Sequence, residues 1–184
     1  MEQVSQFRYL GSLISEDGYC MKQIGSRTEM AKKVFMEKKL FTGKTNLELK
    51  KRIMKCLVWS VALYAAETWT LTQTDRRRLE AFEMWIWRRL EKISWLDKVT
   101  NEEVLKRVNE DRQVLNSIWQ RQYRWISYIL RHNGLLHEII EDRMKGKPTR
   151  GRIQMLHDLA NGDGFVALKW AAEDREVWRQ RERM

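Results

Sequence analysis

Helical periodicity with almost no proline constrains this chain more than any other feature. Pro148 is the single proline in 184 residues, so no pyrrolidine ring interrupts a backbone helix before that point. From Tyr19 onward, apolar residues recur at three- and four-residue steps, the spacing that places them on one face of an α-helix. Hydrophobic residues make up 43% of the chain, enough to build a core. The sequence therefore predicts a mainly α fold, a helical bundle.

The first residues break this pattern. A short apolar and aromatic run precedes the turn dipeptide Asp17-Gly18, and its members are Phe7, Tyr9, Leu10, Leu13 and Ile14. Such a run predicts a strand or a small hairpin. An apolar strand edge without a partner invites association with another chain.

Caps and apolar stripes predict the first two helices. The first is expected over about 21–40, with Ile24, Thr28, Ala31 and Phe35 on its buried stripe. The second is expected to begin at a capping box formed by Thr45 and Glu48 and to end near Tyr64. Because it is apolar around much of its circumference, we expect it in the middle of the bundle, with basic residues on its outer start.

Three further helices are expected before the chain's composition changes. Thr74 can cap a helix that buries Leu79, Phe82, Ile86 and Leu90. A second capping box, Thr100 to Glu103, opens a short helix. A longer one is expected from about Asp111 to the stop signal His132-Asn133-Gly134.

Basic residues and glycines then replace the helical pattern between 143 and 152. This segment has no acidic residue, and its cations are Arg143, Lys145, Lys147, Arg150 and Arg152. It is typical of a flexible linker that can also grip phosphates through guanidinium groups. The predicted organisation is a hairpin at 1–19, a helical bundle at 20–142, a basic linker at 143–152 and a C-terminal helical segment at 153–184.

Charge favours a polyanionic partner. The chain carries a formal net charge of +10 with a pI near 9.7, which favours nucleic acid over an anionic membrane because no long apolar segment accompanies the charge. The longest apolar run, Cys56 to Ala66, is far shorter than the roughly 20 residues of a membrane span. The start MEQVSQF lacks the features of a signal peptide, so a nuclear or cytoplasmic location is expected and secretion is not.

No metal, disulfide or catalytic constellation is evident. The two cysteines and three histidines do not fall at the spacing of a zinc site, and no cofactor is expected. Adjacent acids splay apart on a helix and do not converge on a metal pair, so a solvated face is expected for them. These pairs are Glu102-Glu103, Glu110-Asp111, Glu141-Asp142 and Glu173-Asp174. Most of the nine tryptophans lie within apolar stripes, where a core role is favoured over base stacking.

Three segments in fixed order carry a family resemblance. They are FRYLGS from Phe7, VWSVALYAAETW from Val58 and DKVTNEEVLKR from Asp97. This series resembles the reverse transcriptases of non-LTR (LINE-type, RTE/BovB-like) retrotransposons, in the region after the polymerase palm. The resemblance implies the thumb and C-terminal segment of the second open reading frame.

The resemblance also implies what the chain lacks. The palm's paired aspartates, which would use Mg²⁺, are expected before FRYLGS, and the family's endonuclease lies further upstream. The chain is therefore expected to be no enzyme on its own. The resemblance implies contact with the backbones of RNA, an RNA-DNA hybrid or DNA, and with the palm of the same polypeptide.

Candidate contacts are the clustered cations, which neutralise phosphates without reading sequence. The leading group is Lys50, Lys51, Arg52 and Lys55. A second group, Arg76, Arg77 and Arg78, lies at the start of a predicted helix, where cations oppose the helix dipole. The linker cations form the third group. A solvated face remains the alternative for the first two groups, and a plain linker for the third.

Two functional interpretations stay open. The first is a thumb-like fragment that binds nucleic acid. The second is a helical protein-association module or a nonfunctional retroelement remnant that self-associates through the surface that once faced the palm. Steep salt dependence of nucleic-acid affinity distinguishes the first from the second.

Overall fold

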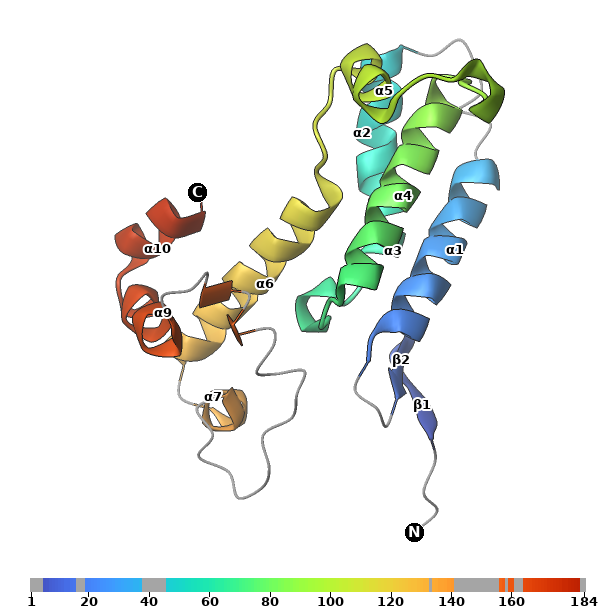
Figure 1. The fold of residues 1–184 in the computed structure, drawn as a ribbon. Coiled ribbons are helices and arrows are strands. Elements are labelled where there is room, and N and C mark those ends of the chain that lie inside the picture. Colours follow the sequence, from blue (N-terminus) through green and yellow to red (C-terminus); the bar gives the residue numbers. More distant parts are fainter. Residues whose placement is uncertain are drawn as a thin grey trace. The chain divides into compact units, whose positions relative to one another are not determined.

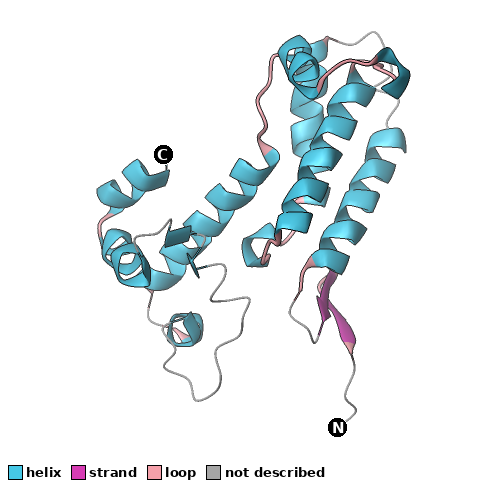
Figure 2. Ribbon diagram, in the orientation of Figure 1, coloured by secondary structure: helices cyan, strands magenta, loops and turns pink. Residues whose placement is uncertain are grey.

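The computed structural model describes residues 5–15, 19–37, 46–132, 134–140, 156–157, 159–160 and 164–182. Over these residues the fold is mainly α with a short N-terminal hairpin, which confirms the predicted fold class (Figures 1 and 2). The chain divides into two compact units. Unit 1 combines Met1–Cys20, Ala65–Leu71 and Ser117–Met184, and unit 2 combines Met21–Tyr64 with Thr72–Asn116.

The predicted domain ranges stay a prediction. The expected linker at 143–152 lies outside the described residues. The described part of the C-terminal segment belongs to the same compact unit as residues 117–140.

The N-terminal hairpin consists of β1 (Gln6–Tyr9) and β2 (Ser12–Ser15), paired antiparallel with Phe7 opposite Ile14. Its turn is Leu10-Gly11, where φ is 47° and 77°. Two successive positive φ values match the right-handed twist of paired strands, as in a type I′ turn. The strands therefore turn before Asp17-Gly18, a dipeptide outside the described residues.

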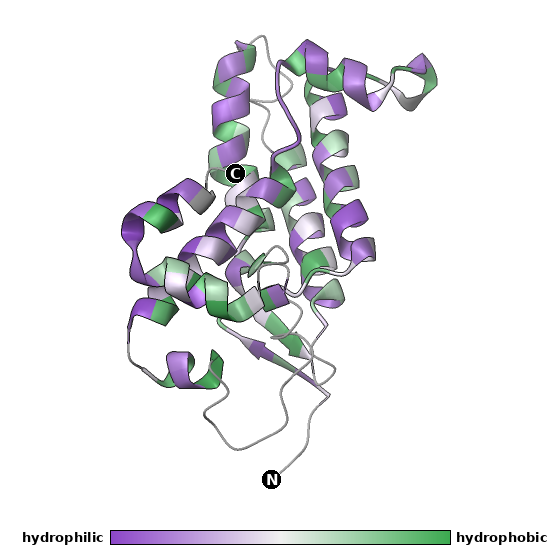
Figure 3. Ribbon diagram, turned by 60° about the vertical axis from the view of Figure 1, so that its left-hand side comes forward, coloured by the Kyte–Doolittle hydropathy of each residue, from purple (hydrophilic) through white to green (hydrophobic). Residues whose placement is uncertain are grey.

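Unit 2 is built around α1 (Met21–Glu37) and α4 (Gln73–Leu90), which lie side by side (Figure 1). The predicted stripes of both helices are buried. They contribute Ile24, Thr28, Ala31 and Phe35 from α1, and Leu79, Phe82, Ile86 and Leu90 from α4. Figure 3 shows the resulting alternation of apolar and hydrophilic residues around the helices.

The cap of α4 differs from the predicted one. Thr72, not Thr74, is the N-cap, and it forms a capping box with Asp75: the Asp75 amide donates to Thr72 Oγ1 at 3.2 Å, and the Thr72 amide donates to Asp75 Oδ2 at 3.1 Å. A carboxylate three residues after the cap accounts for the shift, because Thr74 has no acid at that spacing.

Helix α5 (Asn101–Val108) begins at Thr100, as predicted. Thr100 Oγ1 accepts from the Glu103 amide at 3.2 Å. In the expected capping box, the Glu103 side chain would also accept from the Thr100 amide. Instead, Glu103 Oε1 accepts from Arg107, one turn later, at 2.6 Å. Val104 and Val108 face the core.

The second predicted helix is a composite of α2 (Leu47–Ile53), the π-helical turn η2 (Met54–Val58) and α3 (Trp59–Ala62). Its cap is Asn46, whose side chain accepts from the Glu48 amide, and Thr45 lies outside the described residues. The composite packs on α1.

The expectation that this composite lies in the middle of the bundle was wrong. Met54, Val58 and Ala62 are fully buried, but Leu49, Leu57 and Tyr64 are 41–48% exposed. The composite therefore buries residues against α1 but leaves other apolar residues exposed.

Unit 1 gathers its core around α6 (Val114–Arg131), with α7 (Leu135–Ile140), α9 (Gly164–Glu173) and α10 (Arg175–Glu182). The Tyr123 ring stacks between Trp119 and Trp178, with centroid distances of 4.9 and 3.9 Å. Helix α6 begins at Val114, later than the predicted Asp111.

The turn that carries the AAETW segment is a 3-10 turn, η3 (Ala66–Thr68). Gln122 Nε2 donates to the Ala66 carbonyl at 3.3 Å and to the Trp69 carbonyl at 2.7 Å. Trp69 is 2% exposed, so its role in this turn is structural. None of the described helices is both long and apolar enough to cross a membrane.

Candidate nucleic-acid interface

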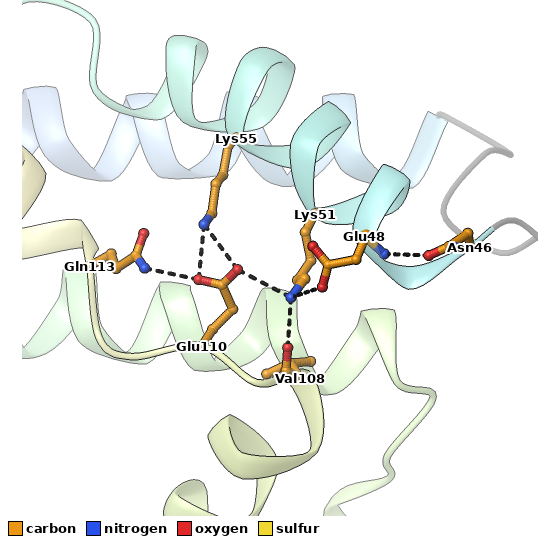
Figure 4. Close-up of polar contacts among 7 residues, drawn as sticks. All are labelled: Asn46, Glu48, Lys51, Lys55, Val108, Glu110 and Gln113. Atoms are coloured by element: carbon orange, nitrogen blue, oxygen red, sulfur yellow. Dashed lines mark hydrogen bonds and ion pairs between the residues drawn. The ribbon is translucent and has the colours of Figure 1, made fainter.

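The first predicted group of cations does not form an outer face. Lys50 is 8% exposed and Lys51 is 3% exposed, so the expectation that these residues decorate the outside of the helix was wrong. Arg52 is exposed, and Lys55 is half-buried. Lys51 and Lys55 point toward the same residue, Glu110 (Figure 4).

Glu110, in the segment between α5 and α6, holds two of these lysines (Figure 4). Lys55 Nζ lies 3.0 and 2.9 Å from the two Glu110 carboxylate oxygens. Lys51 Nζ lies 3.4 Å from Glu110 Oε1, donates to the Val108 carbonyl at 3.0 Å and also pairs with Glu48. We call Lys51, Lys55 and Glu110 the ion-pair cluster.

The electrostatics of the cluster favour charged lysine. The hydrogen bond from Lys51 to Glu48 raises the pKa of Lys51 above 10.5, with further support from Glu110, and burial opposes this rise. The charged ammonium group of Lys51 is thus already paired with groups of the protein itself. Phosphate contact by Lys51 and Lys55 stays a prediction, and it would have to compete with Glu110.

The second predicted group is better placed for a ligand. Arg77 and Arg78 are exposed on α4, and Arg76 is half-buried. Neither Arg77 nor Arg78 has a hydrogen bond or ion pair with any residue that the structure describes. Two adjacent guanidinium groups in the N-terminal half of a helix gain nothing from the helix dipole.

These two arginines line a groove in unit 2, of about 750 Å³. We call it the α1–α4 groove. The two helices supply most of its lining, which includes Gly25, Thr28, Lys32, Arg77, Arg78, Ala81 and Trp85. A volume of this size lies within the range of about 300–1,000 Å³ seen for ligand pockets.

Paired and unpaired charges line the groove together. Its four basic residues include Lys32, which bonds Glu29 at 2.7 Å, and Arg112, which lies 3.7 Å from Glu80. Among the described lining residues, Glu29 and Glu80 are the only acids, so this part of the lining has a net charge of +2. Within each of these two pairs the positive and negative charges cancel, so the remaining positive charge of the lining lies on Arg77 and Arg78.

An aromatic ring completes the groove. Trp85 is half-buried, with its edge-to-face partner Phe35 at a centroid distance of 5.7 Å. Lys32 Nζ lies 5.7 Å and Arg89 Cζ 5.2 Å from the centre of the Trp85 ring. Aromatic rings between cations are typical of proteins that bind single-stranded nucleic acid.

The third predicted group lies outside the described residues. It comprises Arg143, Lys145, Lys147, Arg150 and Arg152. Among the residues that the structure describes, no three His, Cys, Asp or Glu side chains are grouped to hold a metal ion.

Two acids with little exposed surface were not anticipated from the sequence. The expectation that Glu110 lies on a solvated face was wrong, because its side chain is 9% exposed and pairs with Lys55, 55 positions earlier in the chain, which no local pattern can indicate. Glu83 is 2% exposed, and its Oε1 accepts from the Gln113 amide at 2.9 Å just before α6. Its place four residues after Leu79, on the apolar stripe of α4, was a usable signal. Burial raises the pKa of Glu83 above 4.5, although the Gln113 and Val114 amides oppose the rise.

Comparison of the chain with protein families, curated proteins and solved structures found no match.

Proposed function

We propose that this chain binds nucleic acid through its phosphate backbone, without an active site of its own. The observation that carries the proposal is the pair of exposed arginines, Arg77 and Arg78, which lack described partners and line a groove of net positive charge. Guanidinium groups bind phosphates in a bidentate manner and release condensed counterions. Backbone contacts of this kind confer affinity without sequence preference.

The three segments that resemble LINE-type reverse transcriptases support a more specific form of the proposal. In that form the chain is a thumb-like fragment that holds RNA or an RNA-DNA hybrid, in the nucleus or cytoplasm. The thumb would act beside a palm that supplies the aspartates and Mg²⁺. The net charge of +10 agrees with such a partner.

Fluorescence anisotropy of labelled single-stranded RNA, RNA-DNA hybrid and duplex DNA tests the proposal. We expect binding at about 50 mM salt that weakens steeply toward about 200 mM. The double variant Arg77→Ala/Arg78→Ala should weaken binding of all three probes. A control that removes two exposed lysines outside the groove, Lys22→Ala/Lys33→Ala, should have the smaller effect. Equal losses in both variants would remove the groove arginines from the interface.

A second candidate function is protein association, favoured by the exposed face of the hairpin. Phe7, Tyr9 and Ile14 share one face of this two-stranded sheet and are each more than half exposed. A hairpin alone is marginally stable in water and gains from a covering surface. Light scattering after gel filtration separates the two candidates: an oligomer that dissociates in the variant Phe7→Ser/Ile14→Ser, with no nucleic-acid binding, would favour association.

A further inference from the structure

Part of the α1–α4 groove is lined by small residues that leave unfilled space; we call this part the open floor. Gly25 and Ala81 both line the groove, and a Cβ added at Gly25 would meet no atom within 4 Å. Gly25 lies inside α1, where glycine is unfavourable for helix stability. The absence of a side chain here leaves space in the groove that a larger residue would fill.

The open floor, the ring and the cations lie along one groove. Thr28 and Lys32 follow Gly25 along the α1 side of the lining, and Ala81 and Trp85 follow Arg77 and Arg78 along the α4 side. Residues four apart on a helix lie one above the other. The groove thus combines phosphate-binding groups with an aromatic ring and unfilled space.

We infer that the α1–α4 groove takes an unpaired nucleotide of a single-stranded nucleic acid. Arg77 and Arg78 would hold its phosphates, and its base would enter the groove toward Trp85. The inference rests on the proposed function, and it specifies which form of nucleic acid uses this site. A base in a duplex is stacked and paired, so it cannot enter without being extruded, which costs free energy.

An acidic peptide is less well matched to the same groove. Carboxylates would pair with Arg77 and Arg78, but an acidic side chain has no flat π face to place against Trp85. Every nucleobase has one, which makes base stacking on an aromatic side chain tolerant of sequence. The aromatic ring thus favours the nucleotide.

Filling the groove without changing its charge tests the inference. The variant Gly25→Leu places a side chain in the open space, and Trp85→Ala removes the ring. Gly25→Ala is the control for the loss of glycine. Ser26→Leu is the control for an added leucine, because Ser26 is exposed and does not line the groove.

Each variant is measured as the full chain by anisotropy with a labelled eight-nucleotide oligouridylate RNA and with the same RNA annealed to complementary DNA. We expect Gly25→Leu and Trp85→Ala each to weaken single-strand binding about tenfold. Hybrid binding should stay within about twofold, and both controls should bind as the wild type does. Circular dichroism confirms that the variants are folded, and Gly25→Leu does not depend on the packing of Trp85 against Phe35.

The outcomes separate the two proposals. If the wild type binds RNA and hybrid but Gly25→Leu leaves single-strand affinity unchanged, the groove inference fails and the proposed function stands. Equal losses for single strand and hybrid would overturn the inference as well, as would an octaglutamate peptide that displaces the RNA from the wild type but not from Trp85→Ala. If the wild type binds no nucleic acid at about 50 mM salt, both proposals fail.

Discussion

Neutralising Glu110 tests whether the ion-pair cluster stabilises unit 2. The side chain of Glu110 is 9% exposed, and those of Lys51 and Lys55 are 4% and 33% exposed. The variant Glu110→Gln keeps the shape of the side chain but removes the charge that faces both ammonium groups. Breaking a buried ion pair on one side costs about 3–5 kcal/mol, because the remaining charge is left without compensation.

Two features of the cluster reduce the expected loss. Lys51 keeps its contacts with Glu48 and the Val108 carbonyl, and Lys55 is a third exposed, so water can solvate it. We therefore expect Glu110→Gln to lower the free energy of unfolding by about 2 kcal/mol. With a urea m-value of about 2 kcal/mol/M, the midpoint would fall by about 1 M.

Urea unfolding followed by circular dichroism measures this change. The matched control is Glu103→Gln, which breaks the Arg107 pair, where both side chains are about half exposed; its expected loss is below about 0.5 kcal/mol. A double-mutant cycle with Lys51→Met should give a coupling of about 1 kcal/mol or more. Equal midpoints for Glu110→Gln and Glu103→Gln would refute the assignment of a stabilising role to the cluster.

Three further perturbations test local features. Glu83 binds its proton more tightly in the folded state, so its contribution to stability falls as pH rises from about 4.5 through the raised pKa. The stability of Glu83→Gln relative to wild type should therefore be greater at pH 7.5 than at pH 4. A difference in urea midpoints that does not change with pH would contradict this. Gly164 has φ +82°, and an added Cβ would meet no atom within 4 Å, so Gly164→Ala should lower the free energy of unfolding by about 1 kcal/mol through backbone strain alone. The control Gly134→Ala should change it by less than about 0.5 kcal/mol in thermal unfolding. Equal effects of the two variants would exclude backbone strain as the cause. Leu10 has φ 47° in the hairpin turn, so Leu10→Asn should stabilise the hairpin by about 0.5–1 kcal/mol, seen as slower amide exchange in β1, and faster exchange would argue against the turn.

The helices of this chain were predictable because their determinants are local. Ile24, Thr28, Ala31 and Phe35 recur at helical spacing, and all four are buried. Thr100 was identified as a cap from the residues that follow it. Thr74 was expected as the cap of α4, but the cap is Thr72, because Thr72 is the residue that exchanges hydrogen bonds with Asp75.

The surface of the fold was less predictable, because it depends on partners distant in sequence. Lys51 and Lys55 look like solvated cations on α2 and η2 until Glu110 is placed beside them. Leu49 and Leu57 look like core residues until one side of their helix is found exposed.

The α1–α4 groove shows the same limit at the candidate site. Arg77 and Arg78 were identified from the sequence as cations without a helical reason. The approach of α1, which adds Gly25 and Lys32 to the same groove, is a tertiary feature that periodicity does not encode.

The salt dependence of RNA affinity tests the central claim most directly. For wild-type protein and a labelled single-stranded RNA, the logarithm of the binding constant should fall linearly with the logarithm of salt concentration. If Arg77 and Arg78 each contact one phosphate, Arg77→Ala/Arg78→Ala should reduce the magnitude of this slope by about 1–2. A wild-type affinity that does not change between about 50 and 200 mM salt, or no binding at the lower concentration, would contradict nucleic-acid binding through the phosphate backbone.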